Sequence, residues 1–575
     1  MKKVLSLLKN YKKEAFLAPF FKFVEAVFEL FVPLVMADII DVGIPASDTS
    51  YIVKKGLVLV LLAAAGLSVS ITAQFFAAKA AVGVSGSLRK KLFDHIMGLE
   101  AREVDKAGTS TLITRMTSDV NQVQTGINMS LRLLLRSPII VFGAMIMAFT
   151  IDVPSALIFC IAVPVLAVIV IGITRFSIPM FAGVQKLLDK VMLSSRENLT
   201  GVRVIRAFNL QDDEKNSFYE KNNALKTKQI SASDFTALTN PITFIVVNTA
   251  VMFLIYKGAI RVNIGAITQG QAVAILNYMS QILVELLKLT NLIVTITKSI
   301  ASAGRVSDVL DLGEETSESD ETVVSVAGDT DSFIRFDHVS LKYSAGSDEA
   351  LSDISFVVSK GMTVGVIGGT GSGKSSLVNL IPGMYEATSG TVTVAGEDVK
   401  TCDRIKLRDR IGVVPQKAVL FKGTVRSNMQ IGREDATDEE IIECLKKAQA
   451  YDFVTEKGGP DAEVLQNGKN FSGGQKQRLT IARALVRKPE ILILDDSTSA
   501  LDFLTEKHIR EEIAKLRDMT VFIVSQRASS VMNADMIIVL DDGKAAGIGT
   551  HEELLKLNGL YAKLYSQQFR EYESF

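Results

Sequence analysis

The sequence is short of the side chains that build most metal and disulfide sites. Its three cysteines, Cys160, Cys402 and Cys444, lie far apart without a CxxC pair, and only four histidines occur in 575 residues. This spacing argues against a disulfide framework or a zinc site. Charge of one sign is not in excess either, because 63 basic residues balance 63 acidic ones. The balance gives no indication of a nucleic-acid partner.

Long apolar runs, by contrast, are frequent in the first half of the chain. Hydrophobic residues make up 48% of the sequence and are concentrated before about residue 310. A membrane-spanning helix needs about 20 predominantly apolar residues. The runs that are long enough are Ala15–Val42, Leu57–Ala81, Leu131–Thr150, Ala156–Pro179, Phe235–Tyr256 and Ala272–Ile296. We therefore predict an α-helical transmembrane domain with six helices over residues 1–312, in contact with a lipid bilayer.

The loops between these runs alternate in charge. Three are short and hold no lysine or arginine, whereas residues 85–120 hold six and residues 182–234 hold nine. Cytoplasmic loops are enriched in these side chains, so both termini and the two long loops are predicted to be cytoplasmic. Each long loop has room for a short docking helix, near Ala101–Thr109 and Asn209–Ser217. Residues 1–13 are too polar for a cleavable signal and are predicted to form an amphipathic helix on the inner membrane surface.

Two of the apolar runs carry polar stripes, because residues three or four apart share one face of a helix. The stripes consist of Asn128, Arg132 and Arg136 in one run, and of Asn277, Gln281, Glu285 and Lys288 in another. Ionisable groups at membrane depth are expensive and face a protein interior or a wet cavity. Two interpretations stay open. The stripes line a translocation path, or Glu285 and Lys288 pair with each other inside the helix bundle.

The second half of the chain follows an acidic stretch at residues 313–331. This stretch has few large apolar side chains and is predicted to be a surface linker. Strand and helix signals alternate from Phe333 onward. Residues 332–575 are therefore predicted to form an α/β domain with a parallel sheet.

A phosphate-binding loop is the clearest motif of this second domain. The segment VGVIGGTGSGKSSLVNL reads as a buried strand, a glycine-rich loop and a helix, and Gly368, Gly373, Lys374 and Ser375 fit the spacing G-x-x-x-x-G-K-[ST]. The glycines let the backbone curl round a phosphate, and the helix N-terminus points N–H groups at the anion. The lysine can reach the outer phosphates, and the serine hydroxyl can bind Mg²⁺. The loop therefore predicts a P-loop nucleotide-binding domain.

Two further motifs follow at suitable distances. The strand EILILDD ends in Asp495, placed to hold Mg²⁺ opposite Ser375, and in Asp496, where a base for water would be needed. Between the phosphate loop and this strand lies FSGGQKQR (Phe471–Arg478), whose turn opening a helix forms a second anion-binding nest. One nucleotide needs a single cradle on each side. The second nest therefore suggests use by a neighbouring chain.

With these motifs the whole chain resembles exporter-type ABC transporters in half-transporter form, with six membrane helices before one nucleotide-binding domain. GGTGSGKSS looks like the Walker A motif and ILILDD like Walker B, and FSGGQ is similar to the LSGGQ signature, with Phe471 for the usual leucine. STSALD, which ends at Asp502, resembles the D-loop. Gln416 in VVPQ matches the Q-loop, and Tyr343 in LKYS matches the aromatic A-loop that stacks on adenine.

The resemblance implies ATP and Mg²⁺ as ligands, with two ATP molecules held between head-to-tail nucleotide-binding domains. The residues that it places at ATP are Tyr343, Gly368, Gly369, Thr370, Gly371, Ser372, Gly373, Lys374, Ser375, Ser376, Phe471, Ser472, Gly473, Gly474, Gln475 and Asp502. Those that it places at Mg²⁺ are Ser375, Gln416 and Asp495, and those at the hydrolysis step are Gln416, Asp496 and Gln526.

At two positions the chain departs from the family pattern. The residue after the Walker B aspartate is usually glutamate and is Asp496 here, and the switch histidine is replaced by Gln526 in IVSQR. Aspartate is one methylene shorter, a general base must come within about 2.6–3.2 Å of its proton, and a misplacement of about 1 Å can cost roughly 10²-fold in rate. Glutamine is neutral at every pH. The chain is thus expected to bind ATP well at its own Walker face and to hydrolyse it slowly.

The signature, in contrast, is intact and would serve ATP bound on another chain. The economical hypothesis is a heterodimer with a second half-transporter that supplies the glutamate and the histidine. The alternative is a homodimer in which Asp496 is a tolerated variant. Rival functions are an importer built on the exporter fold, as in some siderophore systems, and an ATP-gated channel or regulatory subunit.

The transported substrate cannot be read from the motifs. A wide apolar lining with scattered polar groups suits a small amphipathic compound, such as a drug, a lipid or a peptide. We see no transit peptide and no long outer loop, which fits a bacterial inner membrane.

Overall fold

The chain forms two compact units. One comprises residues 1–97 with 108–312, and the other comprises residues 98–107 with 313–575. The computed structural model describes residues 6–313, 332–344, 346–557 and 559–570. The predicted linker at 313–331 therefore lies outside the described residues, apart from Gly313.

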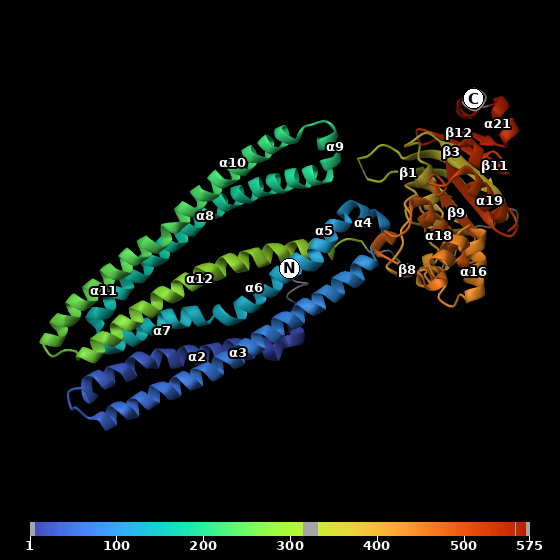
Figure 1. Ribbon diagram of the computed structural model, residues 1–575. Coiled ribbons are helices and arrows are strands. Elements are labelled where there is room, and N and C mark those ends of the chain that lie inside the picture. The colour runs from blue at the N-terminus through green and yellow to red at the C-terminus, as the bar shows by residue number, and fades with distance from the viewer. Residues whose placement is uncertain (1–5, 314–331, 345, 558, 571–575) are drawn as a thin grey trace. The chain divides into compact units, whose positions relative to one another are not determined.

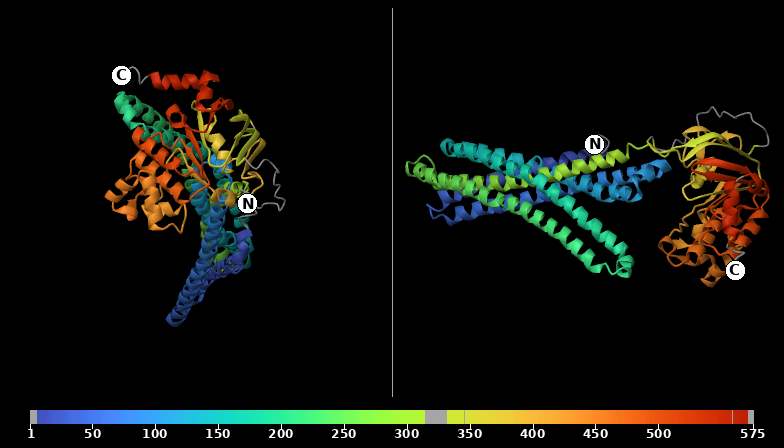
Figure 2. Two further views of the ribbon diagram at one scale, coloured as in Figure 1. Left: turned by 90° about the vertical axis from the view of Figure 1, so that its right-hand side faces the viewer. Right: turned by 90° about the horizontal axis from the view of Figure 1, so that it is seen from above.

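The first unit is a bundle of long helices, and in two views α8 and α10 diverge from the rest toward α9 (Figures 1 and 2). Its elements are η1 (Leu7–Tyr11), α2 (Lys12–Asp38), η2 (Ile39–Gly43), α3 (Thr49–Met97), α5 (Thr109–Thr114), η3 (Arg115–Asp119), α6 (Val120–Leu133), α7 (Arg136–Ile151), α8 (Val153–Thr200), α9 (Val202–Ala207), α10 (Gln211–Ala237), α11 (Thr239–Asn263) and α12 (Gln269–Val309). Five of the described segments are long and apolar enough to cross a membrane: Thr49–Met97, Thr109–Ile151, Val153–Thr200, Gln211–Asn263 and Gln269–Val309.

The first expected membrane helix, Ala15–Val42, corresponds to α2 and the π-helical turn η2. It is absent from the five segments that qualify by length and composition. Its sequence is interrupted by Lys22, Glu25 and Glu29, which lie three or four residues apart. Composition therefore supports a helical membrane domain without confirming six crossings.

The second docking helix was predicted in the wrong place. The short helix at this turn is α9, at 202–207, and Asn209 to Ser217 instead contain a turn and the start of α10. Gly201 separates α8 from α9, and Asn209 takes a left-handed φ of +55° that ends the short helix. Acidic residues 212–214 then favour the N-terminus of the long α10. The first docking helix, α4 (Ala101–Ala107), falls within its expected range.

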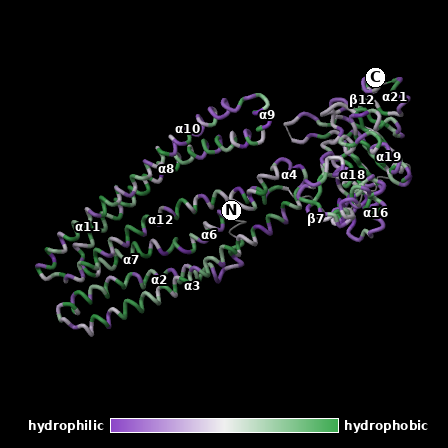
Figure 3. Tube along the Cα trace, in the orientation of Figure 1, coloured by the Kyte–Doolittle hydropathy of each residue, from purple (hydrophilic) through white to green (hydrophobic). Residues whose placement is uncertain are grey.

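Exposed apolar side chains follow the membrane-length helices. In Figure 3, α3, α7, α8 and α11 are largely hydrophobic, whereas α10 carries many more hydrophilic residues. On α8, Ile161 and Val168 remain 70% and 72% exposed. Such surfaces suit hydrocarbon, where each helix satisfies its own backbone hydrogen bonds.

Helix starts and close contacts hold the first unit together. The Asp152 side chain caps α8 by accepting from the Ser155 N–H at 3.1 Å, and it also accepts from Arg261 Nη2 of α11 at 2.6 Å. A Cβ on Gly126 of α6 would lie 2.1 Å from Ser299 Oγ of α12, so these two helices approach closely only because position 126 is glycine.

The second unit is an α/β domain with α4 packed into it. Its larger elements are β1 (Ile334–Leu341), β2 (Leu351–Val358), β3 (Thr363–Gly368), α13 (Lys374–Leu380), β4 (Ser389–Val394), β5 (Glu397–Asp398), α14 (Arg404–Asp409), β6 (Ile411–Val414), α15 (Val425–Gln430), α16 (Asp438–Lys447), α17 (Tyr451–Glu456), α18 (Gly473–Val486), β9 (Ile491–Asp495), α19 (Phe503–Ala514), β10 (Thr520–Ser525), α20 (Ala528–Val531), β11 (Met536–Asp541), β12 (Lys544–Gly549), α21 (His551–Leu557) and α22 (Gly559–Arg570). Between α15 and α18, β7 (Gly423–Thr424) pairs with β8 (Glu463–Val464).

Two sheets organise this unit. Strands β2-β1-β4-β5 form an antiparallel sheet, and β12-β11-β3-β10-β9-β6 form a second sheet that is parallel from β11 to β6. The parallel strands are buried almost throughout, as expected for a sheet covered on both faces. One apolar core lies on each side of this sheet, with Val364 and Val366 in one and Ile367 in the other.

Candidate nucleotide site

The carboxyl ends of four parallel strands bring the predicted site residues to one edge of the sheet. Ile367 of β3 lies opposite Ser525 of β10, and Val524 of β10 lies opposite Asp495 of β9. On the far side of β9, Val414 of β6 pairs with the preceding leucine. The phosphate loop, the two acids, the switch position and Gln416 thus follow neighbouring strands. In open α/β sheets this edge is where ligands bind.

Backbone geometry shapes the phosphate loop. It leaves β3 at Gly368 and enters α13 at Lys374. Gly373 has a φ of +95°, and a Cβ there would lie 2.6 Å from the carbonyl oxygen of Ala350, so the position requires glycine. The middle of the loop, residues 369–371, is exposed and open to a ligand.

Two polar side chains in the loop are buried, and neither forms an ion pair or hydrogen bond with a carboxylate among the described residues. Lys374 is 8% exposed, and its Nζ donates to the carbonyl oxygens of Gly368 at 3.0 Å and Gly369 at 2.5 Å. Burial lowers its pKa, with nearby carboxylates acting in the opposite direction. The Ser372 hydroxyl is buried and has no hydrogen-bond partner among the described residues. A buried ammonium and a spare hydroxyl donor match the oxygens of a phosphate.

Ser375 and Asp495 meet as the sequence predicts. The Ser375 hydroxyl donates to Asp495 Oδ1 at 2.9 Å. Asp495 is 8% exposed, and burial raises its pKa while the hydrogen bond from Ser375 lowers it. A serine hydroxyl beside a carboxylate is an oxygen donor set of the kind that Mg²⁺ takes together with phosphate oxygens. The residues therefore fit a Mg²⁺ site.

The predicted adenine-stacking residue belongs to a chain of side chains that reaches α4. Tyr343 is 40% exposed, and its hydroxyl lies 2.8 Å from that of Ser376 in α13. Its ring packs edge-on against Tyr385, with centroids 5.0 Å apart. The Tyr385 hydroxyl donates a hydrogen bond to the Asp105 carboxylate. The pKa of Tyr385 is raised, mainly by burial and to a smaller extent by the hydrogen bond to Asp105. Side-chain contacts thus connect Tyr343, through Tyr385, with Asp105 of α4.

The signature segment stands apart from the phosphate loop, because no hydrogen bond links the two among the described residues. Ser472 and Gln475 form a capping box at the start of α18, in which each side chain accepts from the backbone N–H of the other residue. Gly473 and Gly474 follow in the first turn, beside Ala500.

Two other residues predicted at ATP have local structural partners. Phe471 is 4% exposed and packs against Phe453 in the core, so its side chain faces inward. Asp502 caps α19 by accepting from the Thr505 N–H at 2.9 Å. Both residues fix the position of backbone at the surface of the domain.

The residues predicted for the hydrolysis step follow the ends of β9, β10 and β6. Asp496 is half-buried, has a φ of +45°, and accepts a hydrogen bond from Gln416 Nε2 at 3.2 Å. Aspartate tolerates this left-handed region better than most residues. Gln526 is exposed directly after β10. Asp496 and Gln526 thus both follow the carboxyl ends of neighbouring parallel strands, β9 and β10.

Sequence reasoning missed two residues that hold the switch segment. The Gln568 amide of α22 donates to the carbonyl oxygen of Gln526 at 2.8 Å and accepts from the Ala528 N–H at 2.7 Å. Glu506 of α19, 2% exposed, accepts from the Ser530 hydroxyl at 2.6 Å. Neither belongs to a motif. No feature of the sequence indicated either contact.

In the first unit the two predicted stripes meet at Glu285. Glu285 Oε1 lies 2.7 Å from Arg136 Nη1 and 2.8 Å from Lys288 Nζ, and its Oε2 accepts from the Ser137 hydroxyl. Arg136 also pairs with Glu29 at 2.6 Å. The pairing interpretation is therefore confirmed for Glu285 and Lys288, and the arginine is an additional partner that was not predicted.

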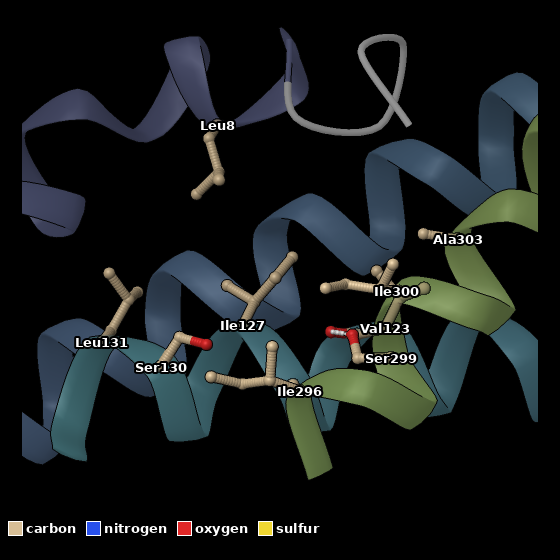
Figure 4. Close-up of a pocket in the computed structure, with 10 residues that line it drawn as sticks. Leu8, Val123, Ile127, Ser130, Leu131, Ile296, Ser299, Ile300 and Ala303 are labelled. Carbon is tan, nitrogen blue, oxygen red and sulfur yellow. Dashed lines mark hydrogen bonds between the residues drawn. The ribbon is translucent and has the colours of Figure 1, made fainter. Parts of the chain in front are cut away.

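Two cavities lie on α12. One, of about 280 Å³, is lined by residues of α2, including Glu29, and by residues of α12, including Glu285 and Lys288. The other, of about 270 Å³, is apolar and is lined by Leu8, Ile127 of α6 and Ile296 and Ile300 of α12, with the Ser130 and Ser299 hydroxyls as its polar groups (Figure 4).

The fold and the site together define a P-loop nucleotide-binding domain fused to a helical membrane domain. Comparison with known proteins agrees. Residues 15–286 match the ABC transporter transmembrane region, and residues 351–499 match the ABC transporter family. The chain is 35% identical to the uncharacterized ABC transporter ATP-binding protein YfiB of Bacillus subtilis, over 99% of both chains. It is 34% identical to the putative multidrug export ATP-binding/permease protein YgaD of the same organism, again over 99% of both.

The solved structure of a bacterial Atm1-family ABC exporter with ATP bound superposes with a TM-score of 0.80, covering 98% of this chain and 99% of the other at 23% identity. This likeness establishes the fold alone. The chain belongs to the ABC transporters and is a half-transporter of exporter-type fold, which dimerises in a membrane and carries an ATP-hydrolysing domain.

Proposed function

We propose that this chain is one subunit of a heterodimeric, ATP-driven exporter of amphipathic compounds, and that its own Walker site hydrolyses ATP slowly. The observation that carries the proposal is the contrast at the sheet edge between binding residues that match the family pattern and hydrolysis residues that depart from it. Lys374, Ser375 and Asp495 fit MgATP, whereas Asp496 and Gln526 replace the family's glutamate and histidine. Export is supported by the similarity to YgaD, which is named a putative multidrug export protein.

The proposed roles of the site residues follow from the length of the Asp496 side chain and from the neutral charge of the Gln526 side chain. Tyr343 and the phosphate loop bind the nucleotide, and Mg²⁺, when bound, offsets the negative charge of the phosphate oxygens. Asp496 must take a proton from water over a distance that suits a longer side chain, and it is already engaged by Gln416. Gln526 can hydrogen-bond phosphate but cannot gain a charge. The intact Ser472 segment would then complete a faster site on a partner that has glutamate and histidine.

We further propose that α2 is the sixth membrane helix, with both termini on the cytoplasmic side of a bacterial inner membrane. The charges that interrupt it are all neutralised locally. Lys22 Nζ lies 2.5 Å from Glu25 Oε2, and Glu29 pairs with Arg136 of α7. Paired charges that face a helix bundle are tolerated at membrane depth.

The test compares nucleotide binding with phosphate release by the full chain purified alone in nanodiscs. We expect the wild type to bind a fluorescent ATP analogue and to turn over slowly. Asp496→Glu with Gln526→His should raise turnover at least about tenfold, because it restores reach and a titratable group. The double variant can be tested without a different partner chain, because a second copy of the same chain supplies an intact signature.

Each single substitution serves as a matched control and should give a smaller gain than the double variant. Brisk turnover by the lone wild-type chain would contradict the slow-site proposal. An unchanged rate in the double variant, with nucleotide binding intact, would contradict the roles given to Asp496 and Gln526.

A further inference from the structure

The cavity of about 280 Å³ between α2 and α12 has one apolar wall and one polar wall. Its α2 wall presents Val32, Pro33 and Met36, and its α12 wall presents Asn277, Ser280 and Gln281. Charged side chains stand at both sides, with Glu29 on α2 and Lys288 on α12. At about 280 Å³ the cavity lies near the lower end of the size range of small-molecule sites, so it suits a compact ligand.

Charge in and behind this cavity sums to zero. The cations Lys22, Arg136 and Lys288 each lie within 4.0 Å of a carboxylate of Glu25, Glu29 or Glu285. A ligand of net charge would leave this neutral cluster unbalanced inside the membrane, where an isolated charge is expensive. A ligand that carries both signs adds no net charge. The cluster therefore favours a zwitterion over a simple cation or anion.

The two most exposed charged side chains of the cavity lining carry opposite charges. The side chains of Glu29 and Lys288 are 39% and 42% exposed, whereas that of Glu285 is only 3% exposed. Gln281 Oε1 is buried and has no hydrogen-bond partner among the described residues, so it can accept from a ligand N–H. The described lining includes no aromatic side chain and thus no face for cation–π binding of a lipophilic cation.

Resting on the proposed function as an exporter subunit, we infer that the transported compound is a small zwitterion with an apolar side group and that it binds in this cavity. The ligand ammonium pairs with Glu29 and the Gln281 carbonyl, and the ligand carboxylate pairs with Lys288. The apolar group lies against Met36 and Val32. This chemistry is that of a short peptide or a related amino-acid derivative.

The experiment measures binding of tritiated L-leucyl-L-leucine to the full chain in nanodiscs by scintillation proximity. Three competitors of nearly equal size change only charge: the C-terminal amide is a cation, the N-acetyl derivative is an anion, and the doubly blocked compound is neutral. Loss of a charged hydrogen bond weakens binding by about tenfold or more. We therefore expect the zwitterion to bind at least about tenfold more tightly than any of the three competitors.

Two variants assign the charges. Lys288→Gln should abolish the preference for the zwitterion over its amide while keeping the preference over the N-acetyl form, and Glu29→Gln should do the reverse. Glu285 keeps Arg136 and Ser137 as partners in both variants, so the cluster is preserved. Ser280→Ala is the matched control, since this hydroxyl lines the cavity but donates to its own helix at Leu276. It should leave the charge preference unchanged.

One blocking variant and a nucleotide measurement complete the design. Val284→Trp, at a lining position that is 49% exposed, should fill the cavity and abolish binding of all four compounds. Absence of binding by the wild type, equal affinities for the four compounds, or equal losses for all four in Glu29→Gln and Lys288→Gln would overturn the inference. ATP binding and turnover in the same nanodiscs report on the proposed function independently, so either idea can fail alone.

Discussion

Lys374 in the nucleotide-binding unit and Arg136 in the membrane unit are equally buried, each with 8% of its surface exposed. Their partners differ. Lys374 Nζ donates to two backbone carbonyl oxygens, and burial lowers its pKa, whereas Arg136 contacts three carboxylates. A buried cation without a counter-ion is costly until an anion arrives, and a buried cation with carboxylate partners is already neutralised. The two cations therefore differ in their partners: Lys374 contacts only backbone oxygens among the described residues, whereas Arg136 contacts carboxylates on other helices.

The largest expected effect is on the nucleotide. Lys374→Ala should weaken ATP binding by on the order of 100-fold or more, because charged hydrogen bonds to phosphate are lost. It should not lower thermal stability in the absence of nucleotide, because it removes a charge that burial disfavours. Titration with a fluorescent ATP analogue and a melting curve of the same sample measure both quantities. A large loss of stability without ATP would place Lys374 in the same class as Arg136.

Arg136 should behave in the opposite way. Arg136→Met leaves Glu29 and Glu285 with fewer partners, and breaking a buried ion pair from one side costs roughly 3–5 kcal/mol. We therefore expect a clearly lower melting temperature in nanodiscs with unchanged ATP affinity in the folded protein. Lys215→Ala is the control, because Lys215 forms an exposed pair with Asp212 at 3.0 Å, and its loss should leave the melting temperature nearly unchanged. Equal melting temperatures for the Arg136 variant and the wild type would contradict the structural role.

Local motifs explain why the phosphate site could be predicted. Gly368 to Ser375 encode their own turn and helix start, and the strand before Asp495 is a continuous apolar run. Once these strands pair in parallel, their carboxyl ends lie at the same edge of the sheet, and the residues that follow them come together. The family models and relatives confirm an ABC transporter, while the individual roles of the site residues stay predictions.

Contacts between distant segments could not be predicted in the same way. Arg136 and Glu285 lie 149 residues apart in the chain, so each stripe was visible in the sequence but their meeting was not. Gln568 gave no signal for its contact with the switch segment, since it lies 42 residues further along the chain and belongs to no motif. The second docking helix was misplaced because Asn209 reads as a helix start but adopts a left-handed turn.

The smallest effect concerns a half-buried carboxylate that is neutralised by two cations. Glu440 of α16 accepts from Lys488 Nζ at 2.5 Å and also bonds Arg433, and these contacts lower its pKa to about 2. Its ordinary pKa is about 4.3, so the stabilisation is fully present above that pH and is lost as the pH falls toward 2. Glu440→Gln keeps the capping box with Thr437, because glutamine also serves there. The variant should melt no more than a few degrees below the wild type at pH 7, and the difference between their melting temperatures should shrink as the pH falls from about 4 toward 2. A difference in melting temperature that stays constant with pH would mean that Glu440 stabilises the domain through packing and not through its charge. The distinction between paired and unpaired charges, drawn from Lys374 and Arg136, would then not apply to Glu440.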